Sequence, residues 1–495
     1  MADIVFTKSA DGSMTCICNG VRLHSAYNPS REAQRFVENI SCDFNPKYIL
    51  VTGAGLSYCV CYLRERFPTA VLCALHYAAE FSTTESIWDK TFYITPDCSL
   101  ADQLYNYMGE EGIVSCLFLS WPPSEKPFAR EFKDSWDEIK KSVIKSRNIL
   151  ATRNYFAKRW VKNAIRFCLF TKHTTYLKKG SMPVVICASG PSLKSSIPFI
   201  KKYRDRFFLM AVSSALLPLT EHKITPDFTL STDGGYWAKL HISFAVDSRE
   251  PLALSAESSC FTNILQNNPI IPLDYGDGIS HDLLSGCGFN SIHAERNGTV
   301  SGTAASLALA LTDRNVYFCG LDLAPTKGFA HTQPNELEIL NALKDSRMFS
   351  TQTRTTPATF PNPSLEIYRD WFVSQNFAGR LYRLSNNFAF SNALGSIKDV
   401  NWNFFTKNEQ RTDGCQPIQC VSQTTELDYP SRKKQLIELI KKHSDDEEWI
   451  KEAVPADYVV WQRSTGFAGE DEAYRKMKEN WTAFTSDILN LLKKS

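Results

Sequence analysis

Residues 183–193 read Pro183-Val-Val-Ile-Cys-Ala-Ser-Gly-Pro-Ser-Leu193, and this stretch decides the fold. Its apolar run predicts a buried strand, and a helical pattern follows from Leu193. A buried strand that turns on Gly-Pro-Ser and enters a helix is how α/β proteins present backbone N–H groups to a phosphate. We therefore expect Ser189–Ser192 to face a nucleotide or another phosphorylated ligand.

The same pattern repeats along the following hundred or so residues of the chain, where apolar runs alternate with helix-compatible stretches. Such alternation predicts an α/β fold with a mainly parallel sheet and helices on both faces, in which ligands bind at the carboxyl ends of the strands. The predicted strands are residues 184–188, 207–212, 228–232, 252–256, 270–273, 291–294 and 316–319.

An earlier βαβ unit carries half of a dinucleotide-binding fingerprint. The strand Tyr48–Thr52 leads into the turn Gly53-Ala-Gly55, and a helix and a second strand at residues 71–75 follow. Tyr58 occupies the place of the third glycine, where a bulky side chain prevents the close approach of helix and strand. A Rossmann-like scaffold without a ligand is the favoured interpretation, and a working cofactor site is the alternative.

From Pro123 the chain becomes polar and helical, and residues 139–180 hold twelve Lys and Arg but no Asp or Glu. Aromatic and small residues recur there at helical spacing, which predicts that one face packs while the other is basic. We expect a solvated pair of connecting helices, with a docking surface for an acidic partner or an anionic donor as the alternative. The packing residues are Phe156, Trp160, Ala164 and Phe167.

Beyond about residue 330 the character changes again. Residues 345–365 are rich in Ser, Thr and Pro and predict a loop, whereas apolar spacing around Leu436 and Phe484 predicts two amphipathic helices. The expected domains are a Rossmann-like α/β domain, a basic helical connector, a central catalytic domain and a helical C-terminal domain, at residues 1–122, 123–180, 181–400 and 401–495.

Composition excludes several classes of protein. A formal net charge of +2 in 495 residues argues against a dedicated nucleic-acid binder. The chain has no long apolar run and begins without a signal-peptide pattern, so neither membrane insertion nor export is expected. Fifteen cysteines, an odd number without paired CxxC spacing, fit reduced thiols in the cytoplasm and not a zinc site.

Polar clusters follow the predicted strands of the central sheet. Each alone is typical of a turn or a helix N-cap, but parallel strands bring their carboxyl ends to one edge. Two of the clusters start helices, so the site suits a donor that bears both a phosphate and a carboxylate. The clusters are Ser189–Ser192, Ser213-Ser214-Ala215, Thr232-Asp233-Gly234-Gly235, Asn297–Thr303, and Gly320-Leu-Asp322 with Gly328–His331.

Several common catalytic motifs are missing from the sequence. There is no P-loop, no Gly-x-Ser-x-Gly elbow and no Asp-x-Asp pair of the kind that holds a metal in many nucleotide-sugar transferases. An enzyme of this class would have to stabilise its leaving phosphate with backbone dipoles, hydroxyls and basic side chains. No cofactor is expected beyond the donor itself.

The central residues resemble a known family, the motility-associated factor (Maf) proteins, which are bacterial flagellin glycosyltransferases. The resemblance covers roughly residues 40–400, and its central domain is also similar to bacterial sialyltransferases and to an archaeal pterin diphosphokinase. This sequence departs from the family pattern at Ser213, where relatives often carry Asn, and at Thr299, where a small residue often follows the glycine. The stretches that carry it are Val184–Leu193, Ser213–Leu216, Ile224–Asp227, Asn297–Ala305, Gly320–Asp322 and Tyr382–Asn386.

The resemblance implies transfer of a nonulosonic acid, a sialic-acid-like sugar, from its CMP-activated form to Ser or Thr of flagellin. By the same resemblance Gly190, Ser192 and Ser214 would contact the cytidine monophosphate, and Ser301-Gly302-Thr303 the sugar carboxylate. Pro191, Ser213 and Asn297 complete the expected binding set.

Transfer also needs a base for the proton of the acceptor hydroxyl. His331 is the first candidate, because an unperturbed histidine titrates near neutral pH. An ordinary histidine in a surface loop is the alternative interpretation. Asp233 and Asp322 are the other candidates. Asp322 is expected rather to orient a ribose or a loop, and Asp233 could hold a divalent ion, although no acidic cluster indicates one.

Two other functions fit the sequence. A pterin-type diphosphokinase would use the same fold with ATP and Mg²⁺, and the missing acidic cluster argues against it. A non-catalytic flagellin-binding assembly factor would use its basic and C-terminal helices, so the strand-end hydroxyls would have no role.

Overall fold

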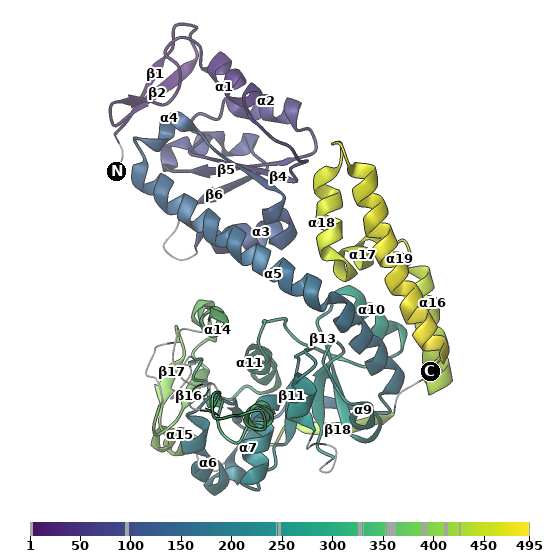
Figure 1. Ribbon diagram of the computed structural model, residues 1–495. Helices are drawn as coiled ribbons and strands as arrows, with labels where there is room; N and C mark the ends of the chain where they lie inside the picture. The colour runs from purple at the N-terminus through teal and green to yellow at the C-terminus, as the bar shows by residue number, and fades with distance from the viewer. Residues whose placement is uncertain are drawn as a thin grey trace. The chain divides into compact units, whose positions relative to one another are not determined.

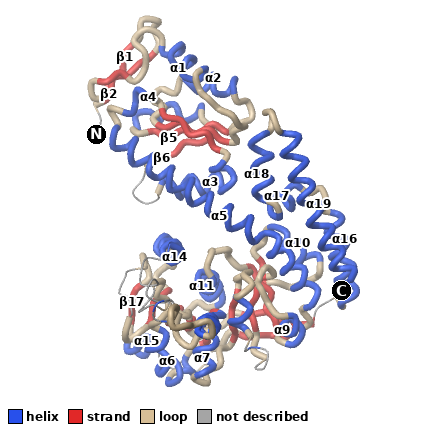
Figure 2. Tube along the Cα trace, in the orientation of Figure 1, coloured by secondary structure: helices blue, strands red, loops and turns tan. Residues whose placement is uncertain are grey.

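The computed structural model describes residues 3–94, 99–243, 245, 249–324, 329, 331–351, 353, 363–388, 394–409, 414–424 and 427–494 (Figure 1). The chain forms two compact units. Unit 1 comprises Met1–Ala157 and Ile450–Phe484, and unit 2 comprises Lys158–Trp449 and Thr485–Ser495. Figure 2 shows the strands of each unit flanked by helices, so the predicted α/β fold class is confirmed. None of the helices in these described ranges is long and apolar enough to cross a membrane.

Unit 1 contains a four-stranded parallel sheet in the order β6-β5-β4-β7. Alternate residues of β4 face opposite layers, as the two-residue period of a strand requires. Ile49 and Val51 pack with helices α1 and α2, whereas Leu50 packs with α3 and α5. The elements are β4 Tyr48–Thr52, β5 Val71–His76, β6 Lys90–Tyr93, β7 Cys116–Ser120, α1 Pro29–Glu38, α2 Cys59–Arg66, α3 Leu100–Val114 and α5 Ala129–Phe170.

A small antiparallel sheet precedes these elements, with β1 Ile4–Lys8, β2 Met14–Cys18 and β3 Val21–Arg22 in that order. Cys16 and Cys18 of β2 are buried beside Phe81 and Phe128. This packing brings the residues that follow β3, including His24, against the turn after β4.

Unit 2 is built on a sheet in the order β17-β16-β15-β9-β10-β11-β12-β13-β8-β18, with β14 also paired to β13. All pairs are parallel except β8 with β18. All four residues of β9 are fully buried, because helices cover both faces of the sheet. The strands are β8 His173–Lys178, β9 Val184–Cys187, β10 Phe208–Val212, β11 Phe228–Ser231, β12 Leu252–Ser255, β13 Pro269–Asp274, β14 Ile292–His293, β15 Val316–Cys319, β16 Leu381–Leu384, β17 Lys398–Val400 and β18 Gln419–Thr424.

The strand order reverses at β9. From β9 the chain adds β10 to β13 on one side, then returns through helix α11 (Val300–Leu311) to place β15 on the other side. The switch point of the sheet therefore lies between β9 and β15. In open α/β sheets this switch point is where ligands bind.

The structure corrects one sequence expectation about helices and confirms another. The expected pair of connecting helices is one continuous helix, α5, of 42 residues. Its sequence contains no Gly or Pro, so nothing interrupts the backbone hydrogen bonds. The two C-terminal amphipathic helices are confirmed as α16 and α19, with two further helices between them. Their bounds are α16 Tyr429–Lys442, α17 Glu447–Ala453, α18 Pro455–Ser464 and α19 Glu470–Lys494.

Candidate functional site at the switch point

The turn after β9 makes a backbone approach that only glycine allows. The Gly190 N–H donates to the carbonyl oxygen of Gly320 at 2.8 Å. A Cβ at Gly190 would lie 2.4 Å from that oxygen and 2.6 Å from Oδ2 of Asp322. The turn then enters helix α6 (Leu193–Lys202). The loops after β9 and β15 are therefore joined directly at the switch point.

Asp322 completes this junction. Its Oδ2 accepts a hydrogen bond from the backbone N–H of Ser192 at 2.7 Å, and the side chain is 4% exposed. Burial raises the pKa of this carboxyl above its usual range, although hydrogen bonds from Ser192 oppose the shift. Asp322 thus holds the start of the helix through its contact with Ser192.

The backbone N–H groups of this turn are already hydrogen-bonded, which limits how an anion could bind there. The sequence analysis expected backbone N–H groups to face a phosphate, but those of Gly190 and Ser192 are bonded within the protein, and Pro191 has none. The difference arises because a carboxylate from another strand, Asp322, occupies the helix start. A phosphate at this turn would therefore be met chiefly by hydroxyls.

Hydroxyls from two neighbouring strands meet beside the turn. Ser214 lies on the 3₁₀ turn η3 (Ser213–Ala215) that follows β10, and its Oγ donates to Oγ of Ser189 at 2.8 Å. Ser213 is buried and Ser214 is half-buried. The structure thus brings together the first two predicted clusters.

The loop that carries His331 lies against the same turn. The N–H of Thr332 donates to the Ser189 carbonyl at 2.6 Å, and its hydroxyl donates to the Gly190 carbonyl at 2.5 Å. Burial lowers the pKa of His331, and the neighbouring His241 lowers it further. Gly328 and Ala330 of this predicted cluster lie outside the described residues.

A histidine–glutamate pair beside His331 was missed by the sequence analysis. Nδ1 of His241 lies 2.8 Å from Oε2 of Glu336, and both side chains are buried. His241 belongs to the 3₁₀ segment η4 (Ala238–Ile242), and Glu336 begins helix α12 (Glu336–Ala342). The two residues are 95 positions apart, so no local sequence signal could pair them.

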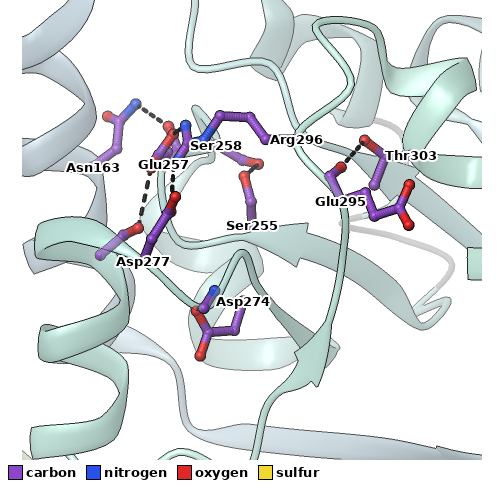
Figure 3. Close-up of polar contacts among 11 residues, drawn as sticks. Asn163, Ser255, Glu257, Ser258, Asp274, Asp277, Glu295, Arg296 and Thr303 are labelled. Atoms are coloured by element: carbon purple, nitrogen blue, oxygen red, sulfur yellow. Dashed lines mark hydrogen bonds and ion pairs between the residues drawn. The ribbon is translucent and has the colours of Figure 1, made fainter. Parts of the chain in front are cut away.

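The fourth predicted cluster forms the start of α11, which packs on β9, β10, β11 and β15. Gly302 is needed because a Cβ there would lie 2.8 Å from Cβ of Asn297 and 3.0 Å from Trp371. The Thr303 hydroxyl donates to the Glu295 carbonyl at 3.0 Å (Figure 3). Thr303 therefore shapes the loop, and Ser301 is half-buried at the helix start.

Asp233, the remaining predicted residue, lies exposed after β11. Its Oδ1 accepts the N–H of Gly235 at 2.7 Å, which is an ordinary turn-forming contact. Its charge also contributes, after burial, to the raised pKa of Tyr368. These contacts give Asp233 a local structural role.

An ion pair between the exposed Arg296 and the buried Glu257 braces the loop that leads to Asn297. Arg296 donates from both terminal nitrogens to Glu257, each at 2.8 Å, and its guanidinium lies 4.2 Å from the ring centroid of Tyr275 (Figure 3). Ser280 and Asn163 donate to the side chain and the backbone carbonyl of Glu257. Burial opposes the charge of Arg296, but the bonds to Glu257 outweigh it and raise the pKa of this guanidinium.

No group of three or more His, Cys, Asp or Glu side chains arranged to hold a metal ion occurs within the ranges of the chain that the structure describes.

Comparison with known proteins supports the same architecture. A protein-family model described as 6-hydroxymethylpterin diphosphokinase MptE-like matches residues 158–328. The solved structure of the Maf glycosyltransferase from Magnetospirillum magneticum AMB-1 aligns with a TM-score of 0.54 and 12% identity, covering 99% of this chain and 92% of that one. This likeness shows a shared fold and confirms the fold expected from the resemblance.

Curated relatives come from Treponema pallidum (strain Nichols) and carry no functional name. One is 29% identical over 323 residues, which is 63% of this chain and 70% of the relative. Another is 25% identical over 222 residues, or 40% of this chain and 74% of the relative.

Proposed function

We propose that this protein is a glycosyltransferase that transfers a nonulosonic acid from a CMP-activated donor to a Ser or Thr hydroxyl of flagellin. One observation carries the proposal. Serine hydroxyls from β9 and β10 meet at the switch point of a sheet whose fold is shared with a Maf glycosyltransferase. Hydroxyls suit a nucleoside monophosphate, which carries less charge than a triphosphate.

The donor would be held at two points. Gly190, Ser192 and Ser214 would contact the cytidine monophosphate. The sugar carboxylate would lie at the start of α11, where the Ser301 hydroxyl and the positive end of the helix dipole favour an anion. Because the Thr303 hydroxyl is already bonded to Glu295, Ser301 would supply the stronger side-chain contact.

The reaction breaks one bond to the sugar and makes another. The acceptor oxygen attacks the anomeric carbon, the bond from that carbon to the phosphate oxygen breaks, and CMP leaves with the bonding electrons. The proton of the acceptor hydroxyl passes to a base near the turn, and the loop of His331 lies there. The leaving phosphate would be stabilised by hydroxyls and helix dipoles.

A diphosphokinase is the second candidate function, because the MptE-like family model matches residues 158–328. It would transfer diphosphate from ATP to a pterin hydroxyl. Such an enzyme should bind ATP with Mg²⁺ more tightly than CMP.

Isothermal titration with CMP, ATP with Mg²⁺, GTP and buffer distinguishes these functions. CMP binding alone, together with mass-spectrometric detection of sugar on flagellin incubated with a CMP-nonulosonic acid, is the result expected. ATP binding without CMP binding would favour the diphosphokinase. Flagellin binding with no nucleotide bound would favour an assembly factor.

A further inference from the structure

His241 and Glu336 form a buried pair whose geometry suits proton transfer. The Nδ1–Oε2 distance is 2.8 Å, and the side chains are 10% and 7% exposed. When the carboxylate accepts a hydrogen bond from Nδ1–H, it selects the tautomer in which Nε2 carries the lone pair. The same carboxylate stabilises the imidazolium that forms when Nε2 takes a proton.

The pair lies beside the candidate site. Segment η4, which carries His241, packs against η3, the segment that carries Ser214. His331 is close enough for the charge of His241 to act on it, and the adjoining Thr332 is bonded to the turn after β9. His241 is therefore near the hydroxyl cluster at the switch point.

A second observation points to a ligand or bound solvent at this cluster. Oε1 of Glu336 and Nδ2 of Asn335 are buried and have no hydrogen-bond partner within the described protein. Asn335 is fully buried and Glu336 is 7% exposed. Buried polar groups normally have partners, so these two neighbouring atoms have room for hydrogen bonds to bound water or to a ligand.

Another histidine–carboxylate pair in unit 2 provides a contrast. Nδ1 of His281 lies 2.7 Å from Oδ2 of Asp274 at the end of β13, but the side chain of His281 is 41% exposed. Three strands separate β13 from β9 in the sheet order. Of these two pairs, the His241–Glu336 pair alone is both buried and adjacent to the loops at the switch point.

We propose that Nε2 of His241, held by Glu336, accepts the proton of the acceptor hydroxyl. This inference rests on the proposed function. The O–H bond breaks as the oxygen bonds to the anomeric carbon, CMP departs with the electrons of the broken C–O bond, and the proton remains on His241 until it passes to solvent. Glu336 acts through His241 as a positioning residue, and His331 is a neighbouring group without a proton-accepting role.

Other charges act on this imidazole. Helix α12 contributes Glu336 and Glu338, the neighbouring loop contributes His331, and η4 itself contributes Lys239. Of the other elements packed on η4, α7 (Leu216–Glu221) carries Glu221, whereas η3 carries no charged side chain. Of these groups, Glu336 is the one hydrogen-bonded to His241.

The test compares His241→Asn, Glu336→Gln and His331→Asn, with His281→Asn as the matched control. Transfer to flagellin from a CMP-nonulosonic acid gives kcat and KM, and titration gives the CMP affinity. His241→Asn should lower kcat by about 100-fold or more with CMP affinity unchanged, since general bases contribute that much. His281→Asn should keep the wild-type rate.

Glu336→Gln should lower kcat by about 10-fold or more and move the acidic limb of the pH–rate profile to lower pH, because the imidazolium loses its counter-charge. A purely structural role would change stability without moving that limb. Near-wild-type turnover in His241→Asn, or loss of turnover in His331→Asn alone, would overturn the inference while leaving the glycosyltransferase proposal intact. A wild-type protein that neither binds CMP nor transfers sugar would overturn both.

Discussion

Two strand–turn–helix units in this chain look alike in sequence and differ in what lies beside the turn. In unit 1, β4 turns on Gly53-Ala-Gly55 and enters α2, and in unit 2, β9 turns on Ser189–Ser192 and enters α6. Both strands are buried and both turns need glycine. Only the neighbours from elsewhere in the chain distinguish them.

In unit 1, protein side chains fill the space at the turn. Nε2 of His24 accepts the N–H of Leu56 at 2.8 Å, which is the contact that a phosphate oxygen would make. A Cβ at Gly53 would lie 2.2 Å from Oγ of Ser124, and one at Gly55 would lie 2.6 Å from Nε2 of His24. The glycines make room for side chains of the same unit.

In unit 2, the corresponding neighbours are hydroxyls and a carboxylate that hold the turn in place. Asp322 and Gly320 fix the backbone, while Ser189 and Ser214 bring their hydroxyls together. In both units the N–H groups of the turn have partners within the protein, so the groups that the rest of the chain brings to a glycine turn, and not the turn itself, decide whether an anion can bind there. The following predictions test this difference between the two turns, starting with the largest expected effect.

The largest effect is expected from Gly190→Ala, with Gly53→Ala as the matched variant. Each added Cβ meets an atom closer than 3 Å, so each should destabilise its own unit by on the order of 3 kcal/mol. Only Gly190→Ala should also reduce CMP affinity, measured by titration, by about 100-fold, since it displaces Asp322 and the turn. If Gly53→Ala abolished CMP binding and Gly190→Ala did not, the nucleotide site would lie at the turn of unit 1 and not at that of unit 2.

His24→Ala should destabilise unit 1 by about 3 kcal/mol, because it leaves the Leu56 N–H without its partner and opens a cavity. Hydrogen exchange of amides in β4, followed by mass spectrometry, measures this local loss. CMP affinity should stay at the wild-type value. If exchange in β4 is unchanged, the imidazole is not what holds the turn.

Acid should weaken unit 1 through the same residue. Burial lowers the pKa of His24 to about 4, so the folded state holds the neutral ring while the unfolded state binds a proton below about pH 6.5. Stability is therefore full above pH 6.5 and falls as the pH drops toward 4, by on the order of 3 kcal/mol. Burial also lowers the pKa of His76 to about 4, which adds to the effect.

Urea unfolding of unit 1 at pH 7, 5.5 and 4.5, with exchange of β4 as the readout, checks this dependence. His24→Gln should flatten the profile by about half, since His76 retains its share. An equally steep profile in that variant would assign the acid sensitivity to other groups.

The smallest effects are expected from single hydroxyls of the candidate site. Ser192→Ala and Ser301→Ala should each weaken donor binding by about 1 kcal/mol or more per lost charge-assisted hydrogen bond. Titration with CMP tests Ser192, and titration with a CMP-nonulosonic acid tests both. Ser285→Ala, an exposed serine on α10 (Gly278–Gly286), is the control. Unchanged affinity in both variants would remove the proposed two-anion site.

The strands of the central sheet were predictable because their physics is local. The predicted strand 316–319 is observed unchanged, and 184–188 and 228–232 differ by one residue at their ends. Strands covered on both faces read as apolar runs. Strand β16 was not expected, because Arg383 interrupts its pattern; that buried arginine forms an ion pair with Asp399 on β17.

The candidate site was predictable only in part. Parallel topology brings the strand-end clusters to one edge, and the structure joins Ser189 to Ser214 and Ser192 to Asp322. The occupied N–H groups of the turn could not be foreseen, because the carboxylate that takes one of them comes from 130 residues away. The same holds for His241 and Glu336, which meet through η4 and α12.

The sequence by itself determined the α/β fold class, the buried strands and the two glycine turns, since apolar periodicity and backbone sterics act over a few residues. Tertiary structure alone decided which groups lie beside each turn. The reason is that the fold decides which side chains lie at a turn. Those side chains fill the space there and bond to its polar groups. Residues 189–192 received hydroxyls and Asp322, and residues 53–55 received His24.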